Sequence, residues 1–158
     1  MERLTRLLLL GVVAVALLGL ACGEEEEHGF EKQIISTGEA PKAIGPYSQA
    51  VKVGPWLFAS GQIAIDPATG ELVTGDFERE ARRVLDNVGA VLKAAGMDYA
   101  DVVQATVYLS DLSLYGKLNQ VYAEYFKSEF PARCAVQVAR LPKDVRLEIA
   151  VTAYKAEK

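Results

Sequence analysis

The spacing of apolar residues changes several times along the chain, and each change marks the boundary of an expected element. Short runs rich in β-branched and aromatic residues predict strands at 32–36, 48–53 and 56–60, because such side chains pack well on a half-buried sheet. Gly54-Pro55 separates the second run from the third, and this dipeptide is typical of a tight turn. The pattern therefore predicts a β-hairpin in the first half of the chain.

Two longer segments repeat their apolar residues every three or four positions, which is the period of one helix face. The first segment runs from Phe77 to Ala95, and Gly96 is placed to end the helix. The second segment spans 114–126. A β-branched run at 102–109 lies between them, so the expected order is helix, strand, helix.

Two closing strands are predicted at 133–138 and 145–154. Alternation in the last strand places five apolar residues on one face, namely Val145, Leu147, Ile149, Val151 and Ala153. Glu148 belongs to the opposite face. Its side chain is therefore expected to point away from the helix-covered core.

This order of elements predicts an α+β fold with a mixed sheet and both helices on one face. Hydrophobic residues make up 51% of the 158 residues, which supports one core and leaves too little for two domains. The other face of the sheet then needs a cover, and copies of the same chain can supply it. We therefore expect a ring-like homo-oligomer.

The first 22 residues predict an export signal. Arg3 and Arg6 precede an apolar stretch at 7–20, and the small residue Ala21 follows it. This stretch of roughly 14 residues is shorter than the ~20 that cross a bilayer, which favours a signal over a permanent transmembrane helix.

The last four residues of this signal, 19–22, resemble a bacterial lipobox, in which the cysteine is acylated and becomes the mature N-terminus. Cys22 is therefore a candidate lipid anchor, and ordinary signal cleavage after Ala21 is the alternative. Four successive glutamates lie in residues 23–31, which predicts a flexible acidic tether because a like-charge run buries no apolar surface. The folded domain then spans 32–158 and is expected outside the cytoplasm, anchored at the periplasmic or extracytoplasmic face of a membrane.

The charged and metal-binding residues argue against several kinds of partner. The formal net charge is −4 and the lysines and arginines form no cluster, which disfavours binding to nucleic acid. Cys22 and Cys134 are far apart and His28 is the single histidine, so a structural zinc site lacks ligands. A lone cysteine in a strand, such as Cys134, is expected to be a small buried hydrophobe.

Three segments combine turn residues with isolated polar groups, and loop or strand-end positions of this kind commonly carry function: 44–48 (IGPYS), 59–63 (ASGQI) and 130–136 (FPARCAV). Together with LDNV at 85–88 and VARLPKD at 138–144, they resemble the reactive intermediate deaminase family (Rid or YjgF type), in particular its RidA-like enamine/imine deaminases. The resemblance covers nearly everything from residue 34 to residue 154, in the family's order and spacing.

The resemblance implies a chorismate-mutase-like fold that assembles as a barrel-like homotrimer with three sites at the subunit interfaces. It implies a 2-iminobutanoate/2-iminopropanoate deaminase, which hydrolyses 2-aminoacrylate and related 2-imino acids to 2-keto acids and ammonia without a metal or organic cofactor. Two alternatives remain at the cell envelope. One is a non-catalytic module that binds a keto acid or amino acid, and the other is a chaperone-like protein that uses exposed apolar surface.

Two charged residues match the family's catalytic positions. Arg133 matches the arginine that anchors the substrate carboxylate, which a planar guanidinium can hold through two parallel hydrogen bonds. Glu148 matches the glutamate that positions and deprotonates the attacking water. The alternatives are a simple salt bridge for Arg133 and a solvated edge-strand position for Glu148. We expect both groups to converge on one inter-subunit cavity.

Five further residues match positions around the family's ligand. Tyr47, Ser60 and Asn119 offer hydroxyl and amide groups that can orient a substrate or a water molecule. Gly61 and Ala135 correspond to main-chain groups that face the ligand, and glycine permits a close approach. Ala135 stands where many relatives have cysteine, so catalysis by a thiol at that place is excluded.

Overall fold

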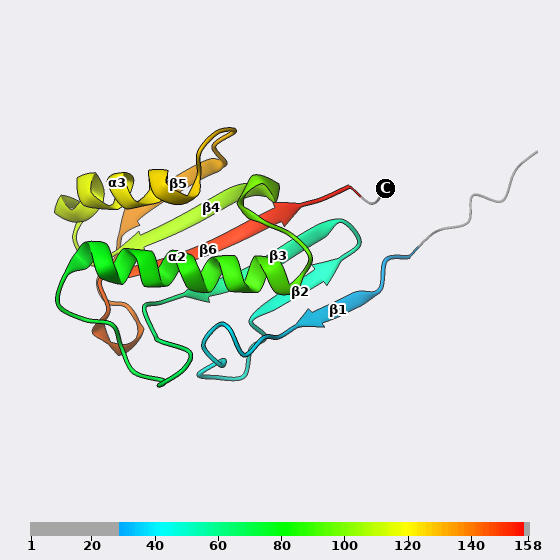
Figure 1. Ribbon diagram of the computed structural model, residues 1–158, viewed down its shortest axis with the longest axis horizontal. Coiled ribbons are helices and arrows are strands. Elements are labelled where there is room, and N and C mark those ends of the chain that lie inside the picture. Colours follow the sequence, from blue (N-terminus) through cyan, green and yellow to red (C-terminus); the bar gives the residue numbers. More distant parts are fainter. Residues whose placement is uncertain (1–28, 157–158) are drawn as a thin grey trace, which may run out of the picture.

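The computed structural model describes residues 29–156 as one six-stranded sheet with two α-helices (Figure 1). The strands are β1 (Lys32–Ile35), β2 (Ala50–Val53), β3 (Trp56–Gln62), β4 (Val102–Leu109), β5 (Ala132–Gln137) and β6 (Leu147–Tyr154). The helices are α2 (Phe77–Ala94) and α3 (Tyr115–Tyr125), with short 3-10 turns at Tyr99–Asp101, Leu112–Leu114 and Pro142–Asp144. The expected export signal, its Cys22 and most of the acidic tether lie outside the described residues.

The strands follow the order β1-β2-β3-β6-β4-β5 across the sheet. β4 and β5 run parallel, and the other neighbouring strands pair antiparallel, so the sheet is mixed as expected. The hairpin between β2 and β3 turns at Gly54, whose φ of 54° favours glycine. Gly96, with a φ of 73°, follows the end of α2. Each expected strand and helix therefore forms close to its predicted bounds.

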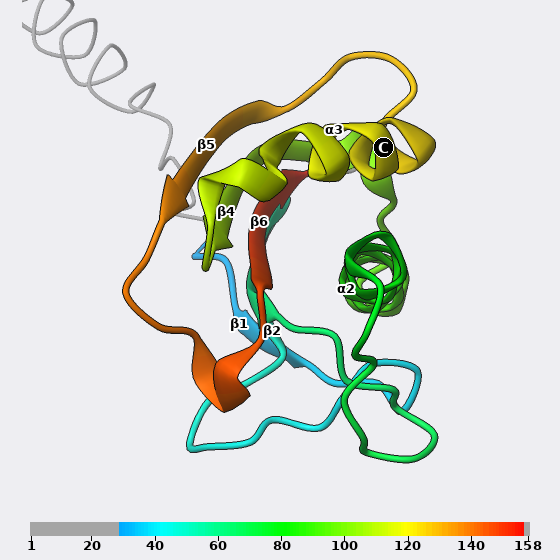
Figure 2. The same ribbon diagram turned by 90° about the vertical axis from the view of Figure 1, so that its left-hand side faces the viewer.

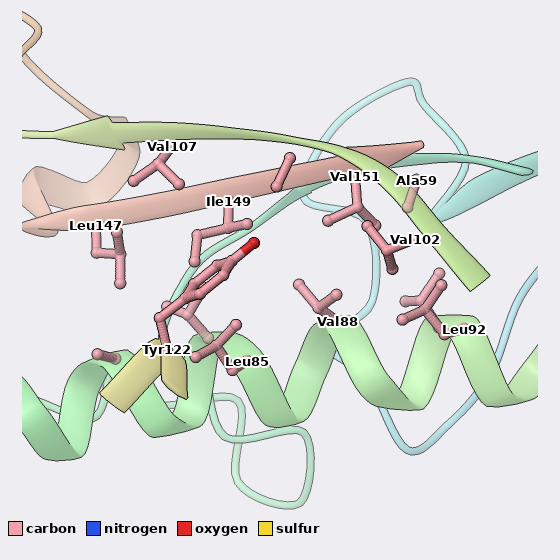
Figure 3. Packing of buried hydrophobic residues seen from close by; sticks show 14 of the residues in the cluster. Ala59, Leu85, Val88, Leu92, Val102, Val107, Tyr122, Leu147, Ile149 and Val151 are labelled. Carbon is pink, nitrogen blue, oxygen red and sulfur yellow. The ribbon is translucent and has the colours of Figure 1, made fainter. Parts of the chain in front are cut away.

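Both helices cover the same face of the sheet (Figure 2). The core fills the space between, where Leu85, Val88 and Leu92 of α2 lie opposite Ile149 and Val151 of β6 (Figure 3). Each of these side chains is at most 4% exposed, and full burial of such a side chain contributes about 1.5–3 kcal/mol. The predicted alternation in β6 is thus confirmed, and it leaves Glu148 half-buried on the opposite face.

In the part of the chain that the structure describes, no other element covers the opposite face of the sheet. Phe58 of β3 is 51% exposed and Val136 of β5 is 38% exposed. Cys134 is also exposed, so the expectation that it is a buried hydrophobe is wrong for the single chain. The reason is its position on an edge strand, paired with Thr106 on the side away from the helices. Within residues 29–156, no helix is both long and apolar enough to cross a bilayer.

Candidate active site

Arg133 lies on β5 beside helix α3. Its partner across the parallel pair is the buried Ala105, so its side chain emerges on the helix-covered side of the sheet. Its Nη2 donates hydrogen bonds to Asn119 Oδ1 at 2.7 Å and to the Tyr115 hydroxyl at 2.9 Å. The guanidinium carbon also lies 4.6 Å from the ring centroid of Tyr122 and 5.3 Å from that of Tyr115. Polar and cation–π contacts with one helix face therefore hold this guanidinium in place.

A hollow of about 450 Å³ opens in front of this guanidinium. Its lining residues are Tyr115, Asn119, Tyr122, Ala123, Phe130, Pro131 and Arg133. Among the described residues no carboxylate forms an ion pair with Arg133, so the simple salt bridge is absent from this part of the chain. The hollow combines a positive charge with aromatic walls, an arrangement that suits a small anion with an apolar part.

Glu148 lies in the middle of the sheet, because β6 runs between β3 and β4. The alternative of a solvated glutamate on an edge strand is therefore wrong. Burial raises the pKa of the Glu148 carboxyl above its ordinary value, since loss of solvent disfavours the charged form. A raised pKa makes the carboxylate a stronger base, which suits it to accept a proton from water.

A second hollow, of about 420 Å³, contains the Glu148 side chain. Its lining residues are Ile44, Tyr47, Ser60, Gly61, Ile63, Pro142 and Glu148. The register between β3 and β6 shifts at Ser60 and Gly61, which bends β3 around the carboxyl. A Cβ at Gly61 would lie 2.7 Å from the Glu148 Cδ, a distance that real Cβ atoms do not adopt, so the Glu148 carboxyl keeps this position only beside a glycine.

The polar groups of the second hollow are tied to the backbone. The Ser60 hydroxyl donates to the Ser48 carbonyl at 2.7 Å, which leaves its lone pairs available to a ligand. The Tyr47 hydroxyl accepts a hydrogen bond from the Ile44 amide at 3.2 Å and keeps its own proton available. Both side chains can therefore take part in hydrogen bonding with a molecule in the hollow.

The two hollows open on opposite faces of the sheet. Asn119 belongs with Arg133, whereas Tyr47, Ser60 and Gly61 belong with Glu148. Ala135 lines neither hollow and lies on β5, two residues beyond Arg133. One chain therefore does not bring the guanidinium and the carboxyl into a shared cavity.

Comparison with known proteins shows the family to which the chain belongs. Residues 37–155 match the family described as Endoribonuclease L-PSP, which is the Rid (YjgF) family. The chain belongs to this family. The resemblance found in the sequence motifs is thereby confirmed.

Several members of the Rid family resemble the chain over most of their length. A 2-iminobutanoate/2-iminopropanoate deaminase of Homo sapiens is 52% identical over 124 residues, covering 78% of this chain and 90% of that protein. A RutC family protein of Pyrococcus horikoshii is 56% identical over 124 residues, covering 78% of this chain and 98% of that protein. The YjgF gene product of E. coli has a TM-score of 0.75 at 44% identity, over 78% of this chain and 98% of its own.

E. coli TdcF with bound serine is a further solved relative. Its TM-score is 0.76 at 45% identity, over 78% of this chain and 99% of its own. These structures confirm the chorismate-mutase-like fold that the resemblance implied. The trimer stays a prediction.

Three side chains of this Rid protein were missed by the motif analysis. Tyr115 and Tyr122 contact Arg133 from α3, and their spacing from Asn119, four before and three after, places all three on one helix face. That helical spacing was the signal available in the sequence. Gln49 is 5% exposed, and its amide nitrogen donates to the carbonyls of Ala40 and Pro41. It thereby fixes the loop that leads to Tyr47 and the second hollow.

Proposed function

We propose that this Rid protein hydrolyses 2-aminoacrylate, through its imine tautomer 2-iminopropanoate, and related 2-imino acids to 2-keto acids and ammonia. The observation that carries the proposal is the guanidinium of Arg133, which two neutral side chains hold at a hollow without a carboxylate partner among the described residues. The 52% identity to a protein named 2-iminobutanoate/2-iminopropanoate deaminase supports the same reaction.

Arg133 binds the substrate in this proposal. Its guanidinium holds the carboxylate next to the imine carbon, and charge-assisted hydrogen bonds fix the orientation of that carbon. No cofactor takes part, because the imine carbon of a protonated 2-imino acid is itself electrophilic. The contribution of the protein is orientation and proton transfer.

Glu148 supplies the proton transfer. Its carboxylate accepts a proton from a water molecule as the water oxygen bonds to the imine carbon, which gives a carbinolamine. The carboxyl then returns the proton to the amine nitrogen. As the carbon–nitrogen bond breaks, the Glu148 carboxylate takes the proton of the carbinolamine hydroxyl, which leaves a keto acid, and passes it to the released ammonia, which leaves as ammonium. Half-burial of Glu148 supports this role, because a raised pKa lets the same group accept and return a proton.

The two groups meet between subunits in this proposal. We propose a homotrimer in which Arg133 of one copy faces Glu148 of the next, because the two side chains open on opposite faces of one chain. The uncovered sheet face supports the assembly, since Phe58 and Val136 would otherwise leave an apolar surface in water. A symmetric ring places one site at each interface.

The test is ammonia release by the purified full-length chain from an imino acid generated in situ. Turnover that is lost in both Arg133→Ala and Glu148→Ala, with pyruvate binding lost mainly in the first, is the expected result. Full activity in either variant would refute the role assigned to that residue. If the unaltered chain binds pyruvate but releases no ammonia from the imino acid, the proposed deaminase activity is refuted.

A binding module for small carboxylates is the second candidate, favoured by one relative solved with bound serine. It predicts the same dependence of binding on Arg133 with no ammonia release. The family description refers to cleavage of RNA. The net charge of −4 disfavours that function, because it opposes the binding of negatively charged phosphates.

We also propose that the chain is exported and anchored through an acylated Cys22. The support is the basic start, the apolar stretch and the lipobox-like residues 19–22. Mass spectrometry of the protein purified from membranes tests this directly. A lipid mass on Cys22 is expected, and a soluble mature form that starts at unmodified Cys22 would show ordinary signal cleavage instead.

A further inference from the structure

The hydrogen bonds of Arg133 are concentrated on one nitrogen. Nη2 carries two hydrogens, and within the described residues it has two acceptors, the Asn119 amide oxygen and the Tyr115 hydroxyl. A guanidinium presents two pairs of parallel N–H bonds, and each pair includes one hydrogen of Nη2. A carboxylate that binds Arg133 through two parallel bonds therefore competes with one of these two acceptors.

The chemistry of the two acceptors differs. The amide oxygen of Asn119 can only accept, so it would repel a carboxylate oxygen that came to the same hydrogen. A phenol hydroxyl both accepts and donates. Tyr115 can therefore release the Nη2 hydrogen to the carboxylate and turn its own proton toward that carboxylate.

We propose that Tyr115 is a carboxylate-binding residue that accepts from Arg133 in the empty site and donates to the substrate carboxylate in the occupied one. This inference rests on the proposed function, in which Arg133 holds a carboxylate. It adds a third hydrogen bond to the two from the guanidinium.

The surroundings of Tyr115 support this exchange. The residue lines the Arg133 hollow, and its side chain belongs to a residue that is 40% exposed, so the hydroxyl is accessible from solvent. The hydroxyl donates no hydrogen bond to another described residue, which leaves its proton available. Its ring lies 5.3 Å from the guanidinium carbon and keeps that group in place while the hydroxyl changes partner.

Tyr115→Phe tests the proposal, because it keeps the ring and removes only the hydroxyl. The probe is pyruvate, titrated by calorimetry into the full-length chain. We expect the Kd for pyruvate to rise about tenfold, as for loss of one hydrogen bond to a charged group. The midpoint of thermal unfolding without ligand should stay unchanged, since the hydroxyl is accessible to water.

Tyr154→Phe is the matched control, because Tyr154 is 41% exposed, contacts the Trp56 ring and lines neither hollow. Its Kd for pyruvate should equal that of the unaltered chain. In turnover, Tyr115→Phe should raise KM by a similar factor and leave kcat within about twofold, since the hydroxyl acts on binding.

Ammonia release tests the proposed deaminase activity, and the Kd for pyruvate tests the role of Tyr115. A chain that binds pyruvate without turnover refutes the deaminase, and the Kd of Tyr115→Phe still decides the role of Tyr115. An unchanged Kd in this variant would overturn the inference. Failure of the unaltered chain to bind pyruvate would overturn it as well, because no carboxylate would then occupy the Arg133 hollow.

Discussion

At the scale of single residues, the site depends on two ionisable groups held in different ways. Arg133 is fixed by contacts with neutral side chains of α3, which orient its charge without neutralising it. Glu148 is fixed by its place on a central strand, and burial disfavours its charged form. The first arrangement suits anion binding and the second suits proton transfer, so each residue supports a separate experiment.

Arg133→Lys tests whether the planar guanidinium, with its paired N–H donors, is needed in addition to a positive charge. A lysine keeps the positive charge but loses the paired hydrogen bonds and the contacts with Asn119 and Tyr115. We expect kcat/KM for 2-imino acids to fall about 10- to 100-fold, because an ammonium can keep one hydrogen bond to the carboxylate and loss of the other costs about 1.5–3 kcal/mol. Arg82→Lys, at an exposed pair with Glu124, is the control and should keep full activity. Equal activity of both variants would show that charge alone suffices at position 133.

The pH dependence of kcat/KM tests the raised pKa of Glu148. Only the deprotonated carboxylate can accept a proton from water, so activity should fall as pH drops through the pKa of this group. Because burial raises that pKa, the midpoint of the fall should lie above the ordinary value of 4.5. Glu148→Gln should have a low kcat/KM that no longer falls as the pH drops through this range. A midpoint at or below 4.5 would contradict the proposed environment.

At the scale of elements, the start of β6 is fixed by an ion pair between a buried glutamate and a partly exposed arginine. Glu80 of α2 is 3% exposed, and its carboxylate accepts from the backbone amide of Arg146 at 2.8 Å and from its Nε at 2.7 Å. The bonds to a backbone amide and a guanidinium satisfy both carboxylate oxygens. The helix thereby holds the strand two residues before Glu148.

Gly61→Ala tests the bend of β3 around the carboxyl. The added Cβ collides with Glu148, so either the carboxyl or the strand must shift. We expect kcat to fall strongly and the free energy of unfolding to drop by about 1–3 kcal/mol, as in other overpacked sites. Gly38→Ala is the control, because a Cβ there meets no atom within 4 Å. Retention of kcat in Gly61→Ala would show that the position of Glu148 tolerates displacement.

Local signals in the sequence predicted the elements but not their neighbours. Periodicity located α2 and the buried face of β6, since each depends on residues a few positions apart. The order of strands depends on contacts between distant segments, so the edge position of Cys134 was missed. The side of the sheet on which Arg133 emerges follows from the parallel register of β4 and β5, which no local pattern encodes. Gln49 was missed because its partners are backbone carbonyls of a loop.

At the scale of the whole molecule, the opposite placement of the two hollows makes the oligomer part of the proposed chemistry. Family membership supplied the expectation of a trimer, and the uncovered sheet face gives it a physical reason. A lone chain would have a carboxylate-binding hollow on one face and a proton-transfer group on the other. The activity should therefore depend on contact between copies.

Mixing two inactive variants tests this dependence. Arg133→Ala retains Glu148, and Glu148→Ala retains Arg133, so a site built from one copy of each variant holds both groups. Random co-assembly in a ring should restore about a quarter of the unaltered activity, because half of the copies carry each group and each site draws on two copies. Each variant purified alone should stay inactive and should match the unaltered chain in mass by light scattering. Absence of recovery in co-expressed, mass-verified mixed rings would mean that both groups must come from the same copy, which the opposite faces of the sheet do not allow without rearrangement of β5.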